Sequence, residues 1–227
     1  MKALVVMTRI PVPGMTKTRL LTILSPEDCA GIHRSFLTDI IETTTQLEGD
    51  IDTFLYYGDE GPLDMIVDII PENIVRSPQR GRDLGEKMKN IFEEMFERGY
   101  KEVILMGSDI PEVDSKELEE AFRDLKDRDI IFGPTLDGGY YLVGMKKLYE
   151  SIFSQEIKWG TPEVFKETME LLKERGIEVG LTKVHEDIDT KEDLEGLWNR
   201  IKDSGSCKNT RRYIDGEIGE RLLCHRD

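Results

Sequence analysis

Residues 9–20, with the sequence RIPVPGMTKTRL, carry the side chains best suited to chemistry. Four cations and no acid come before Glu27, although the chain of 227 residues has a net charge of -15. Lys17 offers a compact point charge and Arg19 a planar fork, which are two complementary ways to hold a phosphate. This local reversal of charge, with Arg9 at its start, predicts an anion-binding loop.

The backbone of this loop is stiff and can be approached closely, because Pro13 and Gly14 lie in it. It is not the P-loop of nucleotide hydrolases, since Lys17 has only one glycine upstream and the pattern Gly-x-x-x-x-Gly-Lys-Ser/Thr is missing. A solvated basic turn is the plain alternative. The apolar run at 3–7 favours a binding loop, because it predicts a buried strand, and ligands of open α/β sheets bind at the carboxyl ends of strands.

Another predicted strand, at 103–106, runs into Gly-Ser108-Asp109-Ile-Pro. If the strands are parallel, Asp109 lies at the same sheet edge as the basic loop. A divalent cation that bridges a diphosphate takes only one or two protein carboxylates, so Asp109 is a metal candidate. The alternative is an aspartate that bonds to its own turn before the proline.

The strand predicted at 130–133 is followed by Asp137-Gly138-Gly139. Two interpretations stay open. The segment is a hairpin turn, for which Asp-Gly is a common signal. Alternatively, the glycines let a bulky ligand approach the backbone while Asp137 accepts sugar hydroxyls or contacts the metal.

Two further segments hold candidate ligands. In Asp187-Ile-Asp189, extended backbone would point both acids the same way, so that either is a possible second metal ligand, unless one only supports the helix that follows. Gln79, Arg80 and Arg82 precede another helix and are candidate contacts for a base or a phosphate, although exposed arginines usually do nothing specific.

These loops need an alternating set of strands and helices to bring them together. Hydrophobic periodicity predicts strands at 3–7, 53–57, 103–106, 130–133, 140–145 and 179–184, and helices at 26–47, 85–98, 115–126, 162–175 and 191–202. Ser25, Thr161 and Thr190 are the expected helix-capping hydroxyls. Alternation of this kind predicts one α/β domain with a mainly parallel sheet over 1–202, and the pattern is lost in 203–227, a C-terminal tail.

Composition narrows the class of protein. A pI near 4.8 argues against nucleic acid and anionic membranes as partners and favours a small molecule. The three cysteines follow neither a zinc nor a disulfide pattern, and no apolar run approaches a signal segment or a membrane span, so a cytoplasmic protein is expected. The three histidines share no motif with serine or cysteine, which argues against a nucleophile–base hydrolase. The sequence does not indicate the oligomeric state.

Six motifs in order span residues 9–194. They are PVPG with KTRL at 11–20, Gln79 with DLGEKM at 83–88, GSDIP at 107–111, GP with DGGYYL at 133–142, WGT at 159–161, and DIDT with DL at 187–194. Together they resemble a glycosyltransferase-like family of GT-A-fold nucleotide-diphospho-sugar transferases, some members of which are assigned to arsenosugar biosynthesis. Met15 departs from the basic residue frequent in the family, and Arg9 replaces a frequent lysine.

The resemblance implies a Rossmann-like three-layer α/β/α sandwich of the GT-A type and metal-dependent transfer of a sugar from a nucleotide sugar to a small acceptor. Mg²⁺ or Mn²⁺ would be held by Asp109 and Asp189, and Asp137 or Asp189 would act as base or sugar contact. The implied nucleotide-binding residues are Arg9, Pro13, Gly14, Lys17, Arg19, Gln79, Arg82, Ser108, Gly138 and Gly139.

The Lys-Thr-Arg-Leu segment is also similar to that of the related 2-phospholactate guanylyltransferases, whose loop grips a triphosphate. This similarity implies the alternative, nucleotidyl transfer from a nucleoside triphosphate with release of pyrophosphate. A nucleotide-binding protein without catalysis is the third hypothesis.

Overall fold

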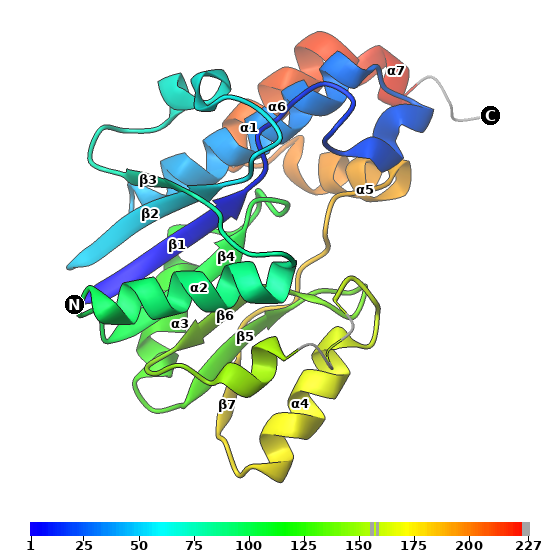
Figure 1. The fold of residues 1–227 in the computed structure, drawn as a ribbon. Helices are drawn as coiled ribbons and strands as arrows, with labels where there is room; N and C mark the ends of the chain where they lie inside the picture. The colour runs from blue at the N-terminus through cyan, green and yellow to red at the C-terminus, as the bar shows by residue number, and fades with distance from the viewer. Residues whose placement is uncertain (155–156, 158, 224–227) are drawn as a thin grey trace.

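The computed structural model describes residues 1–154, 157 and 159–223. Its centre is a seven-stranded sheet of order β3-β2-β1-β4-β6-β5-β7, in which only β6 runs antiparallel to its neighbours (Figure 1). The strands are β1 Lys2–Thr8, β2 Ile51–Tyr57, β3 Val75–Pro78, β4 Glu102–Gly107, β5 Ile130–Pro134, β6 Tyr140–Met145 and β7 Val179–Leu181. The mainly parallel α/β sheet is therefore confirmed.

Helices connect the strands and cover the sheet. The α-helices are α1 Pro26–Thr44, α2 Leu84–Glu97, α3 Ser115–Leu125, α4 Val164–Glu174, α5 Lys191–Ile201, α6 Lys208–Tyr213 and α7 Gly219–Leu223. Short 3₁₀ turns are η1 Thr18–Thr22, η2 Leu63–Met65, η3 Val67–Ile69 and η4 Glu150–Phe153, and η5 Ile214–Ile218 is a π-helical turn. No helix in the described part of the chain combines the length and the apolar character needed to span a membrane.

Alternation along the strands builds two cores. On β1, Leu4 and Val6 face α1 and α3, whereas Val5 faces the core shared with α2 and α4. Successive side chains of a strand point to opposite faces, so each buried strand contributes to both cores. The predicted three-layer α/β/α sandwich is the result.

A third core lies beyond the sheet, where α5, α6 and α7 gather around the start of α1 (Figure 1). Leu20 of η1, Phe36 of α1 and Leu197 of α5 are fully buried in it. This core anchors the basic loop, because η1 is part of that loop and its Leu20 is buried in the core.

Two of the three predicted caps form. Ser25 and Thr190 each make a capping box with the acid three residues on. At α4 the prediction was wrong, since the helix begins at Val164 with Glu163 as its N-cap. The physical reason is a contact with the turn between β5 and β6. The Phe165 amide donates to the Gly138 carbonyl at 3.0 Å, so one backbone donor of the first helical turn is satisfied without a capping hydroxyl.

The segment between β5 and β6 adopts the hairpin alternative. Asp137 Oδ1 accepts the Thr135 hydroxyl at 2.5 Å and the Gly139 amide at 3.1 Å. Gly138 has φ +90, and a Cβ atom there would overlap the Pro162 carbonyl. The glycine is thus explained by the turn and by its contact with the chain before α4.

We expect Gly138→Ala to destabilise the protein more than Gly99→Ala. Both glycines have φ near +90, but a Cβ on Gly99 meets open space. The control isolates the backbone strain of roughly 1–2 kcal/mol, whereas Gly138→Ala must also displace a backbone carbonyl and should cost about 3 kcal/mol or more. Urea unfolding measures the difference, and equal losses would contradict the proposed contact.

Residues 204–223 form more secondary structure than their lost periodicity predicted. Buried Asp39 on α1 accepts the backbone amides of Asn209 and Thr210, both at 2.9 Å, and so caps α6. Ile214 and Ile218 are fully buried in the third core. The boundary between a 1–202 domain and a 203–227 tail remains a proposal, and the described part of that tail packs on α1.

Candidate functional site

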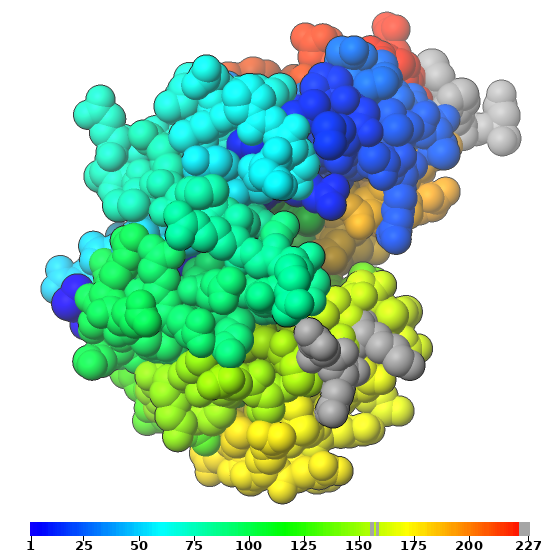
Figure 2. All heavy atoms as spheres, in the orientation of Figure 1, coloured from blue at the N-terminus to red at the C-terminus, as the bar shows by residue number. Residues whose placement is uncertain are grey.

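A cavity of about 700 Å³ opens at the carboxyl ends of β1 and β4. In Figure 2 the surface is hollowed where the blue N-terminal loop, the teal segment before α2 and the orange segment before α5 meet. The predicted residues that line it are Arg9, Lys17, Arg19, Gln79, Ser108, Asp109, Asp187 and Asp189. Four of the five predicted loops, at 9–20, 79–82, 107–111 and 187–189, therefore meet at one place.

Other predicted residues lie outside the lining formed by the described residues, namely Pro13, Gly14, Arg80, Arg82, Asp137, Gly138 and Gly139. Arg82 is exposed and pairs with Glu86 at 2.8 Å. The carboxylate of Asp137 is engaged by its own turn. Gly14 has φ +78 and serves the turn of the basic loop. Direct ligand contacts for these residues remain sequence-based predictions.

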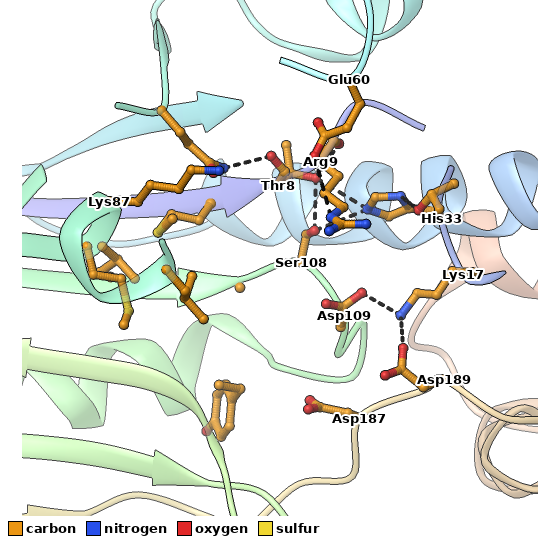
Figure 3. A pocket seen from close by; sticks show the side chains of 18 of the residues that line it. Thr8, Arg9, Lys17, His33, Glu60, Lys87, Ser108, Asp109, Asp187 and Asp189 are labelled. Carbon is orange, nitrogen blue, oxygen red and sulfur yellow. Dashed lines mark hydrogen bonds and ion pairs between the residues drawn. The ribbon is translucent and has the colours of Figure 1, made fainter. Parts of the chain in front are cut away.

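Lys17 is the central cation of the site. Its side chain is only 2% exposed, and its backbone is left-handed with φ 47 at the start of η1. The ammonium donates to the Ile188 carbonyl at 2.7 Å, lies 3.2 Å from Asp189 Oδ1 and pairs with Asp109 (Figure 3). Burial alone would lower the pKa of Lys17, but Asp109 and Asp189 outweigh it and raise the pKa, so the side chain is charged.

Two carboxylates contact this ammonium, and a third, that of Asp187, lines the same cavity. Asp109 follows β4, and Asp187 and Asp189 lie between β7 and α5 (Figure 3). Burial favours the neutral form of Asp109, yet Lys17 reverses the effect and holds the pKa of Asp109 below its usual range. For Asp187, burial and the nearby Asp109 and Asp137 raise the pKa to about 7. The site thus concentrates more negative charge than Lys17 neutralises.

We expect Asp187→Asn to stabilise the metal-free protein above neutral pH. The folded protein holds the proton of Asp187 up to about pH 7, whereas the unfolded chain releases it near its pKa of ~3.9. The stability present below pH ~3.9 is therefore lost progressively as pH rises to about 7. Asparagine carries no charge, so its advantage should grow between about pH 4 and 7, level off above that range and reach on the order of 1 kcal/mol, or ~2–4 °C in Tm.

Thermal unfolding in the presence of a chelator measures this effect. Asp127→Asn, on an exposed residue, is the matched control and should show no such trend. An Asp187→Asn advantage that stays constant across this pH range would contradict the raised pKa.

The remaining predicted residues divide into two kinds. Arg9 and Arg19 have side chains 64% and 73% exposed, lie 3.5 Å from Glu60 and 3.7 Å from Asp189, and have room to meet a ligand. Gln79 instead donates to the Thr8 carbonyl at 2.9 Å and to the Tyr56 carbonyl at 3.0 Å, tying the ends of β1 and β2 together. Its role in the structure is to close the sheet edge.

Sequence reasoning missed several lining residues, among them the polar side chains of His33, Thr16, Glu60 and Lys87. His33 lies inside α1, where no motif marks it; its only signal was a polar residue at a core position of an amphipathic helix. Glu60 belongs to a segment that carried no distinctive spacing, whereas Lys87 lies within the motif at 83–88 but was not singled out as a site residue.

The described residues contain no group of three or more His, Cys, Asp or Glu arranged to hold a metal ion. Lys17 is inserted between Asp109 and Asp189, the pair predicted to bind the metal. Their role as metal ligands therefore remains a prediction.

Comparison with known proteins agrees with this architecture. A protein from Desulfovibrio desulfuricans G20, provisionally named a nucleotide-diphospho-sugar transferase, has a crystal structure that superposes with a TM-score of 0.89 at 30% identity, over 97% of this chain and 96% of that one. The 2-phospho-L-lactate guanylyltransferase of Methanocaldococcus jannaschii is 32% identical over 130 residues, which are 57% of this chain and 54% of the relative. That of Methanocaldococcus sp. strain FS406-22 is 27% identical over 203 residues, 88% of this chain and 82% of the relative.

The sheet order, the cavity at the carboxyl ends of β1 and β4 and the superposition with the D. desulfuricans protein give this chain the nucleotide-diphospho-sugar transferase fold. The chain belongs to the family described as "Uncharacterized protein conserved in bacteria (DUF2064)", whose model matches residues 28–161. The match with the M. jannaschii enzyme spans only about half of that relative's length.

Proposed function

We propose that this protein transfers a nucleotidyl group from a nucleoside triphosphate to a small phosphorylated acceptor and releases pyrophosphate. The observation that carries the proposal is the charged, buried Lys17, held between Asp109 and Asp189 with the exposed Arg9 and Arg19 beside it. The two guanylyltransferase relatives favour this reaction over sugar transfer and suggest GTP as the donor.

In this reaction an acceptor oxygen attacks the α-phosphorus, and the bond from that phosphorus to the oxygen bridging to the β-phosphate breaks. The leaving pyrophosphate takes the electron pair. Arg9, Lys17 and Arg19 line the cavity and would stabilise this anion as its charge develops. Lys17 would do so by turning part of its contact from the aspartates to phosphate oxygens.

The donor set fits a hard divalent cation. Carboxylate oxygens suit Mg²⁺ or Mn²⁺, and the raised pKa of Asp187 marks an excess of negative charge that such a cation would relieve. Asp109 and Asp189 would hold the ion, with phosphate oxygens and water completing its shell. When bound, the ion would neutralise phosphate charge and polarise the reacting phosphoryl group.

Sugar transfer is the second candidate, favoured by the D. desulfuricans relative, which aligns with 97% of this chain. There the bond between the sugar and the β-phosphate breaks, and a nucleoside diphosphate leaves. The same cations would stabilise that anion. The two reactions therefore differ in their products, not in the residues required.

Phosphorus NMR of the products separates the candidates. The purified protein is incubated with Mg²⁺ or Mn²⁺ and with GTP, the other nucleoside triphosphates or nucleotide sugars, each with 2-phospho-L-lactate or another phosphorylated hydroxy acid. Pyrophosphate together with a new phosphoanhydride resonance is the expected result. Nucleoside diphosphate from a nucleotide sugar would instead establish the second candidate, and binding without products would leave a nucleotide-binding protein.

A further inference from the structure

One buried cluster beneath the cavity is not explained by phosphate binding alone. It consists of Thr8, Thr16, His33 and Ser108, all of them buried, and we call it the hydroxyl–imidazole cluster. Figure 3 labels Thr8, His33 and Ser108. The Thr16 hydroxyl lies 2.5 Å from His33 Nδ1, and the hydroxyls of Thr8 and Ser108 each lie 3.3 Å from His33 Nε2. One imidazole therefore contacts three separate segments of the site.

Counting protons assigns the tautomer of His33. The Ser108 hydroxyl donates to Thr8 Oγ1 at 2.9 Å, and the Thr8 hydroxyl donates to the Arg9 carbonyl at 3.0 Å. Each hydroxyl has one proton, so neither has a proton left for the imidazole. His33 Nε2 must then carry the ring proton and share it between the two oxygens, while Nδ1 accepts from Thr16.

The neutral state that this arrangement requires matches the surroundings of the ring. Burial lowers the pKa of His33 to about 4. Asp109 favours the charged ring, but Lys17 and Arg9 oppose it, so the lowering by burial prevails. The imidazole keeps one donor and one acceptor at neutral pH.

Each hydroxyl in the cluster directly precedes a charged residue of the site in the sequence. Thr8 precedes Arg9, Thr16 precedes Lys17, and Ser108 precedes Asp109. A shift of about 1 Å in groups of this kind is costly for catalysis. The ring thus couples the end of β1, the basic loop and the end of β4.

We propose that His33, as its neutral Nε2–H tautomer, is a positioning residue that sets the relative placement of Arg9, Lys17 and Asp109 for a nucleotide's phosphates. This inference rests on the proposed function, since it requires a nucleoside triphosphate in the cavity. His33 itself need not touch the nucleotide. A histidine that only filled the core would affect stability and leave nucleotide affinity unchanged.

The first test is the tautomer in the full-length wild-type protein. Two-dimensional ¹⁵N NMR of histidine-labelled protein distinguishes a protonated Nε2 from a protonated Nδ1 without any ligand. Protonated Nε2 with bare Nδ1 is the expected pattern, whereas a proton on Nδ1 would overturn the inference whatever reaction the protein performs.

The second test is calorimetric binding of GTP with Mg²⁺ to two variants that keep the volume roughly constant. His33→Phe loses the contacts to all three hydroxyls and should weaken nucleotide binding 10- to 100-fold, and His33→Asn, which retains a donor and an acceptor, should restore part of it. Thr16→Val removes only the bond to Nδ1 and should weaken binding about 10-fold. This variant still tests the inference if His33→Phe does not fold.

Ser35→Ala is the matched control, because Ser35 lies on the same helix and donates only within it, to the Gly31 carbonyl at 2.9 Å. It should lower stability without changing affinity. Equal affinities of wild type, Thr16→Val and a folded His33→Phe would overturn the positioning role while leaving the proposed function intact. A wild-type protein that binds no nucleoside triphosphate would overturn the proposed function and this inference together.

Discussion

Lys17→Met is expected to reduce the rate of nucleotidyl transfer by roughly 10²–10³-fold, the usual effect of removing one preorganised donor from a developing anion. Methionine fills a similar volume but has no charge. Because the Lys17 side chain is 2% exposed and faces Asp109 and Asp189, its loss also leaves these carboxylates without their cation. Stability of the metal-free variant should therefore fall as well.

Steady-state kinetics with the productive substrates measures the first effect, and urea unfolding the second. Lys116→Met, on an exposed lysine of α3, is the control and should change neither. Lys17→Arg should not restore activity, since a planar fork cannot replace a point charge in this enclosed position. Turnover within a few-fold of wild type in Lys17→Met would rule out the role given to this residue.

Asp109→Asn should have an effect of similar or greater size, about 10³-fold on turnover, corresponding to ~4 kcal/mol of lost transition-state stabilisation. The change preserves shape and removes the charge that pairs with Lys17 and that would hold Mg²⁺ or Mn²⁺. Mn²⁺ affinity, measured by electron paramagnetic resonance in the presence of GTP, should fall at least about 10-fold.

The two roles of Asp109 can be separated with the same variant. Lost turnover with unchanged Mn²⁺ affinity would show that Asp109 only orients Lys17 and that the ion is held elsewhere. Asp127→Asn again serves as the exposed control. Turnover near the wild-type level would show that Asp109 has no role in the reaction.

The sequence contained enough information to bring the charged loops to one edge. Apolar runs separated by helical periodicity specify parallel strands, and parallel strands end together, so Lys17 and Asp109 had to lie close. Their direct pairing could not be predicted, because it depends on side-chain rotamers and on the left-handed backbone of Lys17.

Other features depend on contacts that no local pattern encodes. The run 140–145 is apolar without alternation, so its pattern does not indicate whether the strand is parallel or antiparallel to its neighbours. The turn at Asp137 makes β6 antiparallel. Helix α6 is six residues long and starts because Asp39, far away in the chain, caps it. His33 has three hydroxyl partners at sequence distances of 17 to 75 residues, beyond the reach of any motif.

The internal pairing of Lys17 has a consequence for how the protein responds to ionic strength. In the free protein this lysine already has its counterions, Asp109 and Asp189, so a nucleotide that reaches it exchanges one anionic partner for another. Dissolved salt screens exposed charges far more than enclosed ones. Nucleotide affinity should therefore vary with salt mainly through the exposed Arg9 and Arg19, and the binding site should work across a wide range of electrolyte concentrations.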